Sequence, residues 1–151
     1  SISNIYIRSK YDWGGCVYST ISHNYQSRSI NGNNVVVDHV TGLMWYQSGS
    51  DTFIEWNKAK QWLKDLNFRG YAGYNDWRLP TVDEAASLLE FSSKNKSLYI
   101  DNVFSRKQKQ IWTGDKLAGS ESAWLVAFQL GTVRYLHIDD RCYVRPVRRL
   151  N

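Results

Sequence analysis

The chain has 151 residues and a mass of 17.6 kDa, and 42% of the residues are hydrophobic, which is typical of one folded domain. No apolar run approaches the about 20 residues that a membrane helix needs, and two cysteines with three scattered histidines are too few for a Cys/His metal site. The net charge of +5 is uneven, because residues 93–151 hold 11 Lys and Arg against 5 Asp and Glu, whereas residues 1–92 hold 8 against 9.

The first half of the chain predicts two short strands followed by a helix. Apolar runs at residues 35–38 and 43–45 follow turn sequences and predict the strands. Thr52 and Glu55 have the spacing of a capping box and predict a helix start, and Gly70 predicts its end. The apolar residues that recur at helical spacing between them are Trp56, Ala59, Leu63 and Leu66.

A second capping box, Thr81 with Glu84, predicts another helix that ends near Phe91. Its apolar face is formed by Val82, Ala85, Leu88 and Leu89. The polar and basic residues 92–110 that follow predict a long loop over the surface.

The final third alternates with a period of two and predicts three strands, at residues 123–128, 132–138 and 143–148. Pro146 donates no backbone hydrogen bond, so the last of these strands is expected at an edge or a bulge. The element order predicts an α+β fold, with two helices packed on an antiparallel sheet and a C-terminal β meander.

Three segments in this order carry a family resemblance. They read VTGLMW at residues 40–45, NDWRLPT at residues 75–81 and YVRPVR at residues 143–148. Together they resemble the Legionella collagen-like C-terminal-domain family over residues 35–148. The resemblance implies a C-type-lectin-like fold, a single domain for the whole chain, and an N-terminal extension at residues 1–34.

The same lectin-like scaffold is similar to that of variable proteins of diversity-generating retroelements, in which a reverse transcriptase rewrites a C-terminal cassette. This resemblance implies a variable region at residues 120–148 and a non-enzymatic ligand-binding protein. It also implies a ligand, protein or glycan, on another cell or host surface. Many Asn, Lys, Ile and Tyr residues indicate an AT-rich source and favour an archaeal viral variable protein.

Alternation in the expected meander leaves an irregular outer face. Trp124, Val126 and Phe128 share one face and are assigned to the core. The mixed opposite face is typical of a binding patch, although a sheet buried on both faces would show the same pattern. The predicted ligand-contacting residues are Leu125, Ala127, Gln129, Leu130, Thr132, Arg134, Leu136, His137, Asp139, Asp140, Arg141 and Cys142.

Three tryptophans and the arginines of the three segments are predicted to be structural. Trp45, Trp77 and Trp124 are expected to hold the scaffold, and the Arg78 guanidinium to satisfy loop carbonyls. One arginine of the last segment is expected to pair with a carboxylate. The arginine candidates are Arg145 and Arg148, and the carboxylate candidates are Asp38 and Asp76.

Two alternative functions stay open. The Lys and Arg residues of segment 94–109 would suit an adhesin or sensor module that binds glycosaminoglycan or another anionic polymer. An enzyme of the sulfatase-modifying type needs cooperating cysteines, whereas Cys16 and Cys142 form no local pair and are expected to be free thiols. We therefore expect no catalytic residues, metal or cofactor.

Location and partners follow from what the sequence lacks. The start of the chain has no signal-peptide pattern, and a cell-surface or virion-exposed location rests on the resemblance alone. No nucleic-acid-binding motif accompanies the basic charge, so neither a nucleic-acid partner nor membrane insertion is expected.

Overall fold

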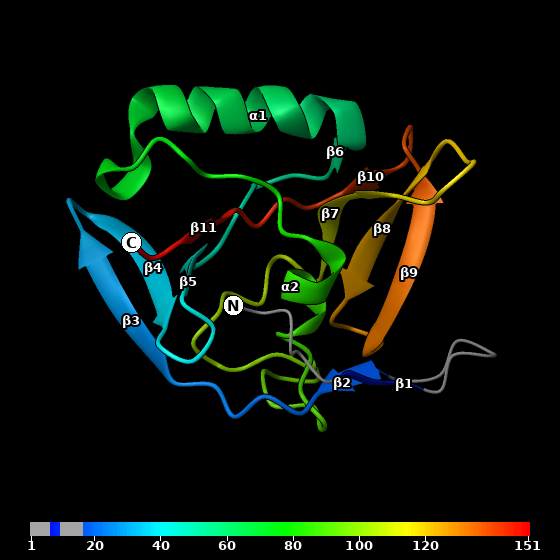
Figure 1. Cartoon of the computed structure of the whole chain (residues 1–151), viewed down its shortest axis with the longest axis horizontal. Helices are drawn as coiled ribbons and strands as arrows, with labels where there is room; N and C mark the ends of the chain where they lie inside the picture. Colours follow the sequence, from blue (N-terminus) through cyan, green and yellow to red (C-terminus); the bar gives the residue numbers. More distant parts are fainter. Residues whose placement is uncertain (1–6, 10–16) are drawn as a thin grey trace.

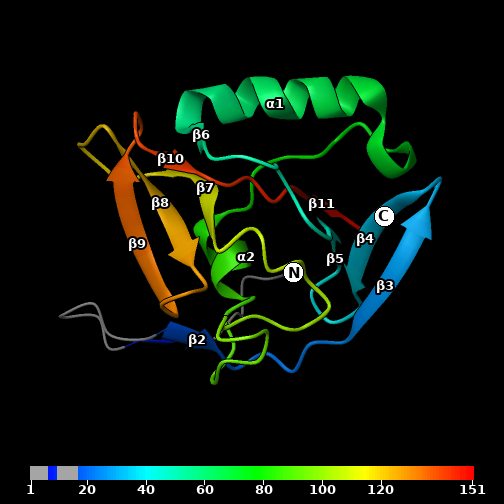
Figure 2. The same cartoon turned by 180° about the vertical axis from the view of Figure 1, so that it is seen from behind.

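The chain forms mostly antiparallel sheets with few helices, an α+β arrangement (Figure 1 and Figure 2). The structure is a computed structural model that describes residues 7–9 and 17–151. The elements, in chain order, are β1 (Ile7–Ser9), β2 (Val17–Ser19), β3 (Tyr25–Ile30), β4 (Asn33–Asp38), β5 (Leu43–Tyr46), β6 (Ile54–Glu55), α1 (Trp56–Arg69), η2 (Tyr71–Gly73), α2 (Val82–Ala86), β7 (Gln110–Lys116), β8 (Ser122–Ala127), β9 (Thr132–His137), β10 (Arg141–Cys142) and β11 (Val147–Arg149).

Two larger sheets lie on opposite sides of the molecule, with α1 across the top and α2 between them (Figure 1). One has the strand order β11-β5-β4-β3 and the other β7-β8-β9. The first contains β3, which the sequence did not predict, joined to β4 by a turn at Asn31 and Gly32. Both turn residues have positive φ, 53° and 79°, as a two-residue hairpin turn requires.

The expected third meander strand at residues 143–148 is wrong. Within this run only residues 147–148 belong to a strand, β11, which pairs with β5, and Tyr143 forms an isolated bridge to Ile111 of β7. Residues 141–142, just before the run, pair with β6. Pro146 lies between these strands, where a missing N–H breaks no ladder, and its carbonyl accepts from the Tyr46 N–H at 3.0 Å. The meander is completed instead by β7, which pairs with β8.

Helix α1 confirms the predicted face but corrects the predicted start. The four apolar residues at helical spacing are buried, and Gly70 ends the helix in the left-handed conformation with φ 67°. The expected capping box at Thr52 and Glu55 is wrong, because Ile54 and Glu55 extend into β6 and pair with β10. Glu55 caps the helix without a side-chain hydrogen bond, and its carboxylate contacts Lys58 at 3.2 Å.

Helix α2 confirms its capping box but is shorter than expected. The Thr81 hydroxyl accepts from the Glu84 N–H, and the Glu84 carboxylate accepts from the Thr81 N–H. The helix ends at Ala86 instead of near Phe91, because the chain turns there and buries two successive leucines in the core. The expected apolar face is otherwise present, with Val82 only half-buried.

Alternate residues of β8 enter two core clusters, one on each face of the sheet. Leu125 and Ala127 belong to the cluster that contains Trp112, whereas Val126 and Phe128, which directly follows the strand, belong to the other. The middle of the sheet is therefore buried on both faces. Among the described residues, no helix combines the length and apolar character that crossing a membrane would need.

Candidate functional site

Four of the twelve predicted contact residues are buried, so the expectation that they lie on an exposed face is wrong. Leu125 has only 1% of its surface exposed, and Ala127, Thr132 and Cys142 are also buried. Leu125, Ala127 and Cys142 belong to the first core cluster, which also includes Trp112 and the buried residues of α1. A sheet buried on both faces explains the apolar outer residues of β8.

The other eight predicted residues lie in β9 and on either side of it. Gln129 and Leu130 lie in the turn before β9, the acidic pair lies in the turn after it, and Arg141 begins β10. Seven are exposed, namely Gln129, Leu130, Arg134, His137, Asp139, Asp140 and Arg141, whereas Leu136 is half-buried. Their role in ligand contact stays a prediction.

The sequence reasoning missed an aromatic pair on the other face of the same strands. Tyr135 is 54% exposed and meets Trp124 edge to face, with ring centroids 5.4 Å apart. Their strand alternation placed them with the core. Because core packing covers only the Val126 end of that face, Trp124 is half-buried and the pair lies at the surface.

Segment 94–109, together with Gln129, lines a hollow that is rich in cations. Its volume is about 660 Å³, and none of the described residues that line it is acidic. We call it the basic hollow. Its lining residues are Lys96, Ser97, Leu98, Ser105, Arg106, Lys107, Lys109 and Gln129. Of these only Gln129 was among the predicted contact residues.

The expected surface loop is anchored from within. Asn95 is buried and donates from its side-chain amide to the carbonyls of Asp101 and Phe104, at 3.2 and 2.8 Å. Leu98 and Phe104 lie in the second core cluster. The exposed cations therefore alternate with buried anchors, which fixes the backbone that carries them.

A second anchor holds the other side of the hollow. Gln108 is fully buried and donates to the Ser50 carbonyl at 3.0 Å. Arg145, also fully buried, donates to the carbonyls of Ser48 and Ser105 at 2.9 and 3.0 Å. Arg145 has no carboxylate partner among the described residues, and burial lowers its pKa. A buried guanidinium thus ties the segment to the framework.

The cations of the basic hollow are largely unpaired. Lys107 contacts the exposed Asp51 at 3.3 Å, an ion pair that water and salt screen strongly. Lys96, Arg106 and Lys109 form no ion pair within the described part of the chain. Like charges held near one another in this way repel, and a bound anion would relieve that repulsion.

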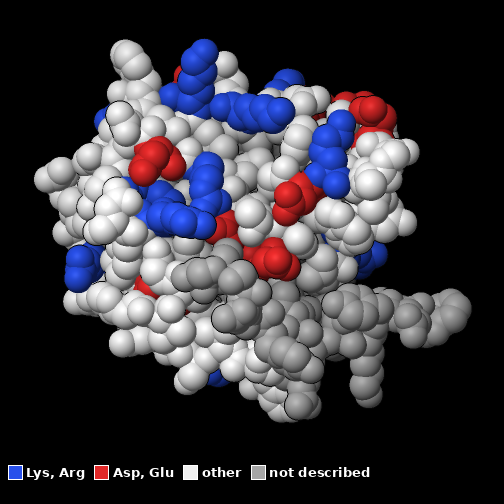
Figure 3. Space-filling view, viewed as in Figure 1, with Lys and Arg blue, Asp and Glu red and all other residues white. Residues whose placement is uncertain are grey.

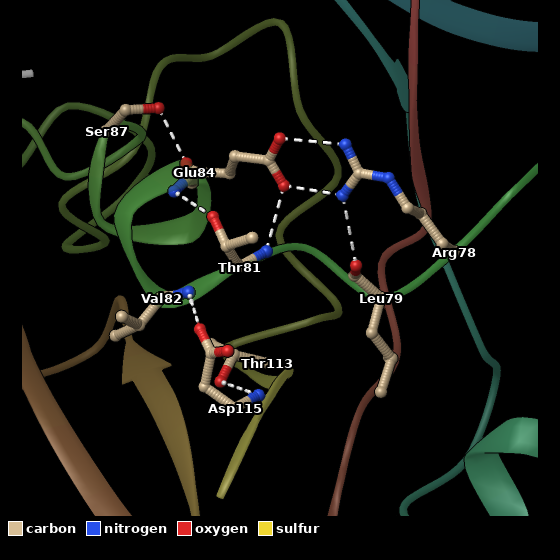
Figure 4. A network of polar contacts seen from close by, with 8 residues as sticks. All are labelled: Arg78, Leu79, Thr81, Val82, Glu84, Ser87, Thr113 and Asp115. Atoms are coloured by element: carbon tan, nitrogen blue, oxygen red, sulfur yellow. Dashed lines mark hydrogen bonds and ion pairs between the residues drawn. The ribbon is translucent and has the colours of Figure 1, made fainter. Parts of the chain in front are cut away.

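Trp77 is buried as predicted, whereas Arg78 pairs mainly with a carboxylate and contacts one loop carbonyl. Figure 4 shows the Arg78 guanidinium in a fork to the Glu84 carboxylate, at 2.6 and 2.8 Å, and bonded to the Leu79 carbonyl. This pair holds the pKa of the Arg78 guanidinium above its usual value. Trp77 is buried and its indole N–H donates to the Tyr71 carbonyl at 2.9 Å.

One arginine of the last sequence segment was predicted to pair with a carboxylate, and this is confirmed for Arg148. Its guanidinium contacts the Asp76 carboxylate at 2.6 Å and lies 3.6 Å from the centre of the Tyr74 ring. The hydrogen bond from Arg148 holds the pKa of Asp76 below its ordinary value. Asp38, the other candidate, is paired with His23 at 2.6 Å.

Cys142 is a free, buried thiol, and burial raises its pKa far above the ordinary value, which disfavours the reactive thiolate. Cys16, the other expected free thiol, lies outside the described residues. Within the described part of the chain, no three His, Cys, Asp or Glu side chains gather where they could hold a metal ion.

The molecule is thus a small α+β domain whose antiparallel sheets carry an anchored, cationic surface segment. The model of the Lcl C-terminal domain family matches residues 34–148. The chain belongs to that family. No curated protein sequence matches it.

Proposed function

We propose that this protein is a non-enzymatic binding protein whose basic hollow holds an anionic polymer, such as a sulfated glycosaminoglycan, in an adhesin or sensor role. One observation carries the proposal: four cations line one hollow in which no described lining residue is acidic. A polymer that bears regularly spaced sulfate or carboxylate groups would engage several of these cations at once.

The anchoring of the segment supports this proposal. A flexible cationic loop loses conformational entropy when it binds, at a cost of about 0.5–1.5 kcal/mol for each side chain that becomes fixed. The buried Asn95 and Gln108 already fix the backbone on both sides of the cations. Binding then orders side chains alone.

Retention on heparin at increasing salt tests the proposal. We expect the double variant Lys107→Glu/Lys109→Glu to elute at clearly lower salt than the wild type, because two contacts become repulsive. The matched control is Arg28→Glu/Lys58→Glu, which changes the net charge equally at exposed residues outside the hollow. If both variants lose retention equally, heparin responds to the net charge of the protein and not to the basic hollow. If the wild type is not retained at all, the proposal is refuted.

We further propose that the fold is C-type-lectin-like. Family membership supports this proposal. The C-terminal strand β11 also pairs with β5, so the two ends of the domain share one sheet. An experimental structure compared with lectin-like domains tests this. A different strand connection would overturn it.

The second candidate function is a retroelement-diversified variable protein, of archaeal viral origin, that displays residues 129–141 to a protein or glycan ligand. The exposure of Arg134, Tyr135 and His137 on the edge strand β9 favours it. Its test is genomic. A near-copy of the DNA for residues 120–148, differing mainly at adenines, should lie beside a reverse transcriptase gene, and the lack of both would remove this candidate.

A further inference from the structure

A second hollow lies between α1 and the chain that leads into α2, separate from the basic hollow. Its volume is about 550 Å³. Its apolar lining, which we call the floor, consists of Trp56, Leu63, Trp77 and Leu79, and Asn67 and Gly114 also line it. We call it the α1 hollow. Figure 3 shows basic side chains along the top of this face, over α1, with further basic and acidic side chains below.

The free charge of the α1 hollow comes from two lysines of α1. Lys60 and Lys64, one helical turn apart, line its rim and form no ion pair within the described residues. The Lys60 ammonium lies 4.6 Å from the centre of the Trp56 ring. Arg78 also lines the hollow, but its charge is already matched by the buried Glu84 carboxylate. The unmatched positive charge therefore lies at the α1 side of the opening.

A third lysine approaches from β7. The Lys116 ammonium lies 5.8 Å from the same Trp56 ring, and its only ion pair in the described chain is a loose one with Glu121 at 3.9 Å. Ammonium groups from α1 and β7 thus both contact the Trp56 indole, although Lys116 does not itself line the hollow. The positive charge gathered around this ring favours an anion nearby.

We propose that the α1 hollow binds a small organic anion with a flat apolar body, such as an aromatic carboxylate or sulfonate. The apolar floor accepts the body, and the lysines of the rim bind the charged group at the opening. The volume lies in the range of small-molecule sites, about 300–1,000 Å³. An inorganic anion would leave the floor uncovered, and an uncharged aromatic would leave the lysines unmatched.

This inference is independent of the proposed polymer site, because the two hollows share no lining residue. Most residues that line the basic hollow are charged or polar, and Leu98 is its only apolar side chain among the described residues. The α1 hollow adds indole and leucine surface to its cations. The two sites therefore favour different anions, and either can fail without the other.

Fluorescence titration with anilinonaphthalene sulfonate tests the inference, since this probe joins an aromatic body to one anionic group. We expect saturable binding at one site, with energy transfer from tryptophan because Trp56 lies in the floor. The uncharged analogue N-phenylnaphthylamine should bind about tenfold more weakly, the loss expected for one charge-assisted contact. Equal affinity for both probes would overturn the role of the lysines.

Two variants and a control locate the site. Lys60→Gln/Lys64→Gln should weaken binding of the sulfonate about tenfold and leave the uncharged analogue unchanged. Gly114→Leu should weaken both probes, because a side chain there would occupy the hollow, and a Cβ meets only ordinary contacts with Leu79 and Pro80, the nearest at 3.6 Å. Lys58→Gln, on the same helix but outside the hollow, is the control.

Thermal melts of each variant ensure that it is folded before binding is compared. If the control weakens binding as much as the double lysine variant, the probe responds to overall charge and the inference is wrong. If Gly114→Leu is folded and binds both probes as the wild type does, the site lies elsewhere and the inference is also wrong.

Discussion

Strand β8 and segment 94–109 both differ from what their sequences suggest. The face of β8 expected to bind a ligand is buried, and the segment expected to be a surface loop is anchored in the core. Strand β8 has an irregular face that is typical of a binding patch, yet alternate residues enter two core clusters. Segment 94–109 is polar and basic, yet Asn95, Leu98 and Gln108 are buried beneath its cations. Exposure is therefore set by what packs against each element, and a polar segment becomes a rigid surface when a few of its residues are anchored.

The largest expected effect tests the burial of β8. Leu125→Ala should lower the free energy of unfolding by about 3 kcal/mol, because it removes buried methyl groups and leaves a cavity. Leu130→Ala, in the turn that follows, should cost less than about 0.5 kcal/mol because Leu130 is 46% exposed. Urea denaturation followed by tryptophan fluorescence measures both. Similar small losses in the two variants would place Leu125 at the surface.

Local sequence patterns predicted the elements that depend on neighbouring residues. The buried face of α1, its end at Gly70 and the capping box at Thr81 each require only residues within one or two helical turns. The failed capping box at Thr52 shows the limit of such patterns. Pairing of residues 54–55 with residues 141–142, far along the chain, replaces the helical start.

Distant contacts explain the rest of what the sequence did not predict. The division of residues 141–149 between two sheets depends on β5 and β6, which come about a hundred residues earlier. The basic hollow depends on Gln108 reaching the Ser50 carbonyl, and no local spacing indicates that bond. The basic charge of segment 94–109 was visible in the sequence, but the anchors that shape it were not.

A second prediction concerns Asp38, a buried carboxylate whose charge is compensated by its hydrogen-bond partners, in contrast to the cations of segment 94–109. Burial would raise the pKa of Asp38, but hydrogen bonds from His23, the Val40 N–H and Thr41 prevail and lower it to about 2. The folded state therefore holds fewer protons than the unfolded state between the two pKa values. We expect a contribution of about 2 kcal/mol that is present above pH about 4 and lost as the pH falls toward 2.

The measurement compares unfolding of the wild type and Asp38→Asn over this acidic range. The wild type should be more stable than the variant near neutral pH. This difference in unfolding free energy should shrink as the pH falls, because protonation of Asp38 in the wild type removes the charge that the asparagine of the variant lacks. A difference that stays constant with pH would mean that the Asp38 carboxylate has an ordinary pKa in the folded protein.

A third, smaller effect tests the anchoring of segment 94–109. Asn95→Ala leaves the carbonyls of Asp101 and Phe104 without their side-chain donor, and we expect a loss of about 1.5 kcal/mol in unfolding free energy. Retention on heparin should fall as well, although no charge has changed, because the cations lose their fixed backbone. Asn102→Ala, at an exposed residue of the same segment, is the control. Unchanged retention in Asn95→Ala would mean that rigidity contributes nothing to binding.

The smallest effect on stability is expected from the cations themselves. Arg106→Gln/Lys109→Gln should change the unfolding free energy by less than about 0.5 kcal/mol, because both side chains are exposed and form no ion pair in the described structure. The two proteins should differ once heparin is added. A ligand at one hundred times its Kd stabilises the folded state by about 2.7 kcal/mol, so a bound polymer raises the Tm. A rise in Tm with heparin in the wild type, and a smaller one in the variant, would assign these charges to recognition. Equal rises would place the polymer on another surface.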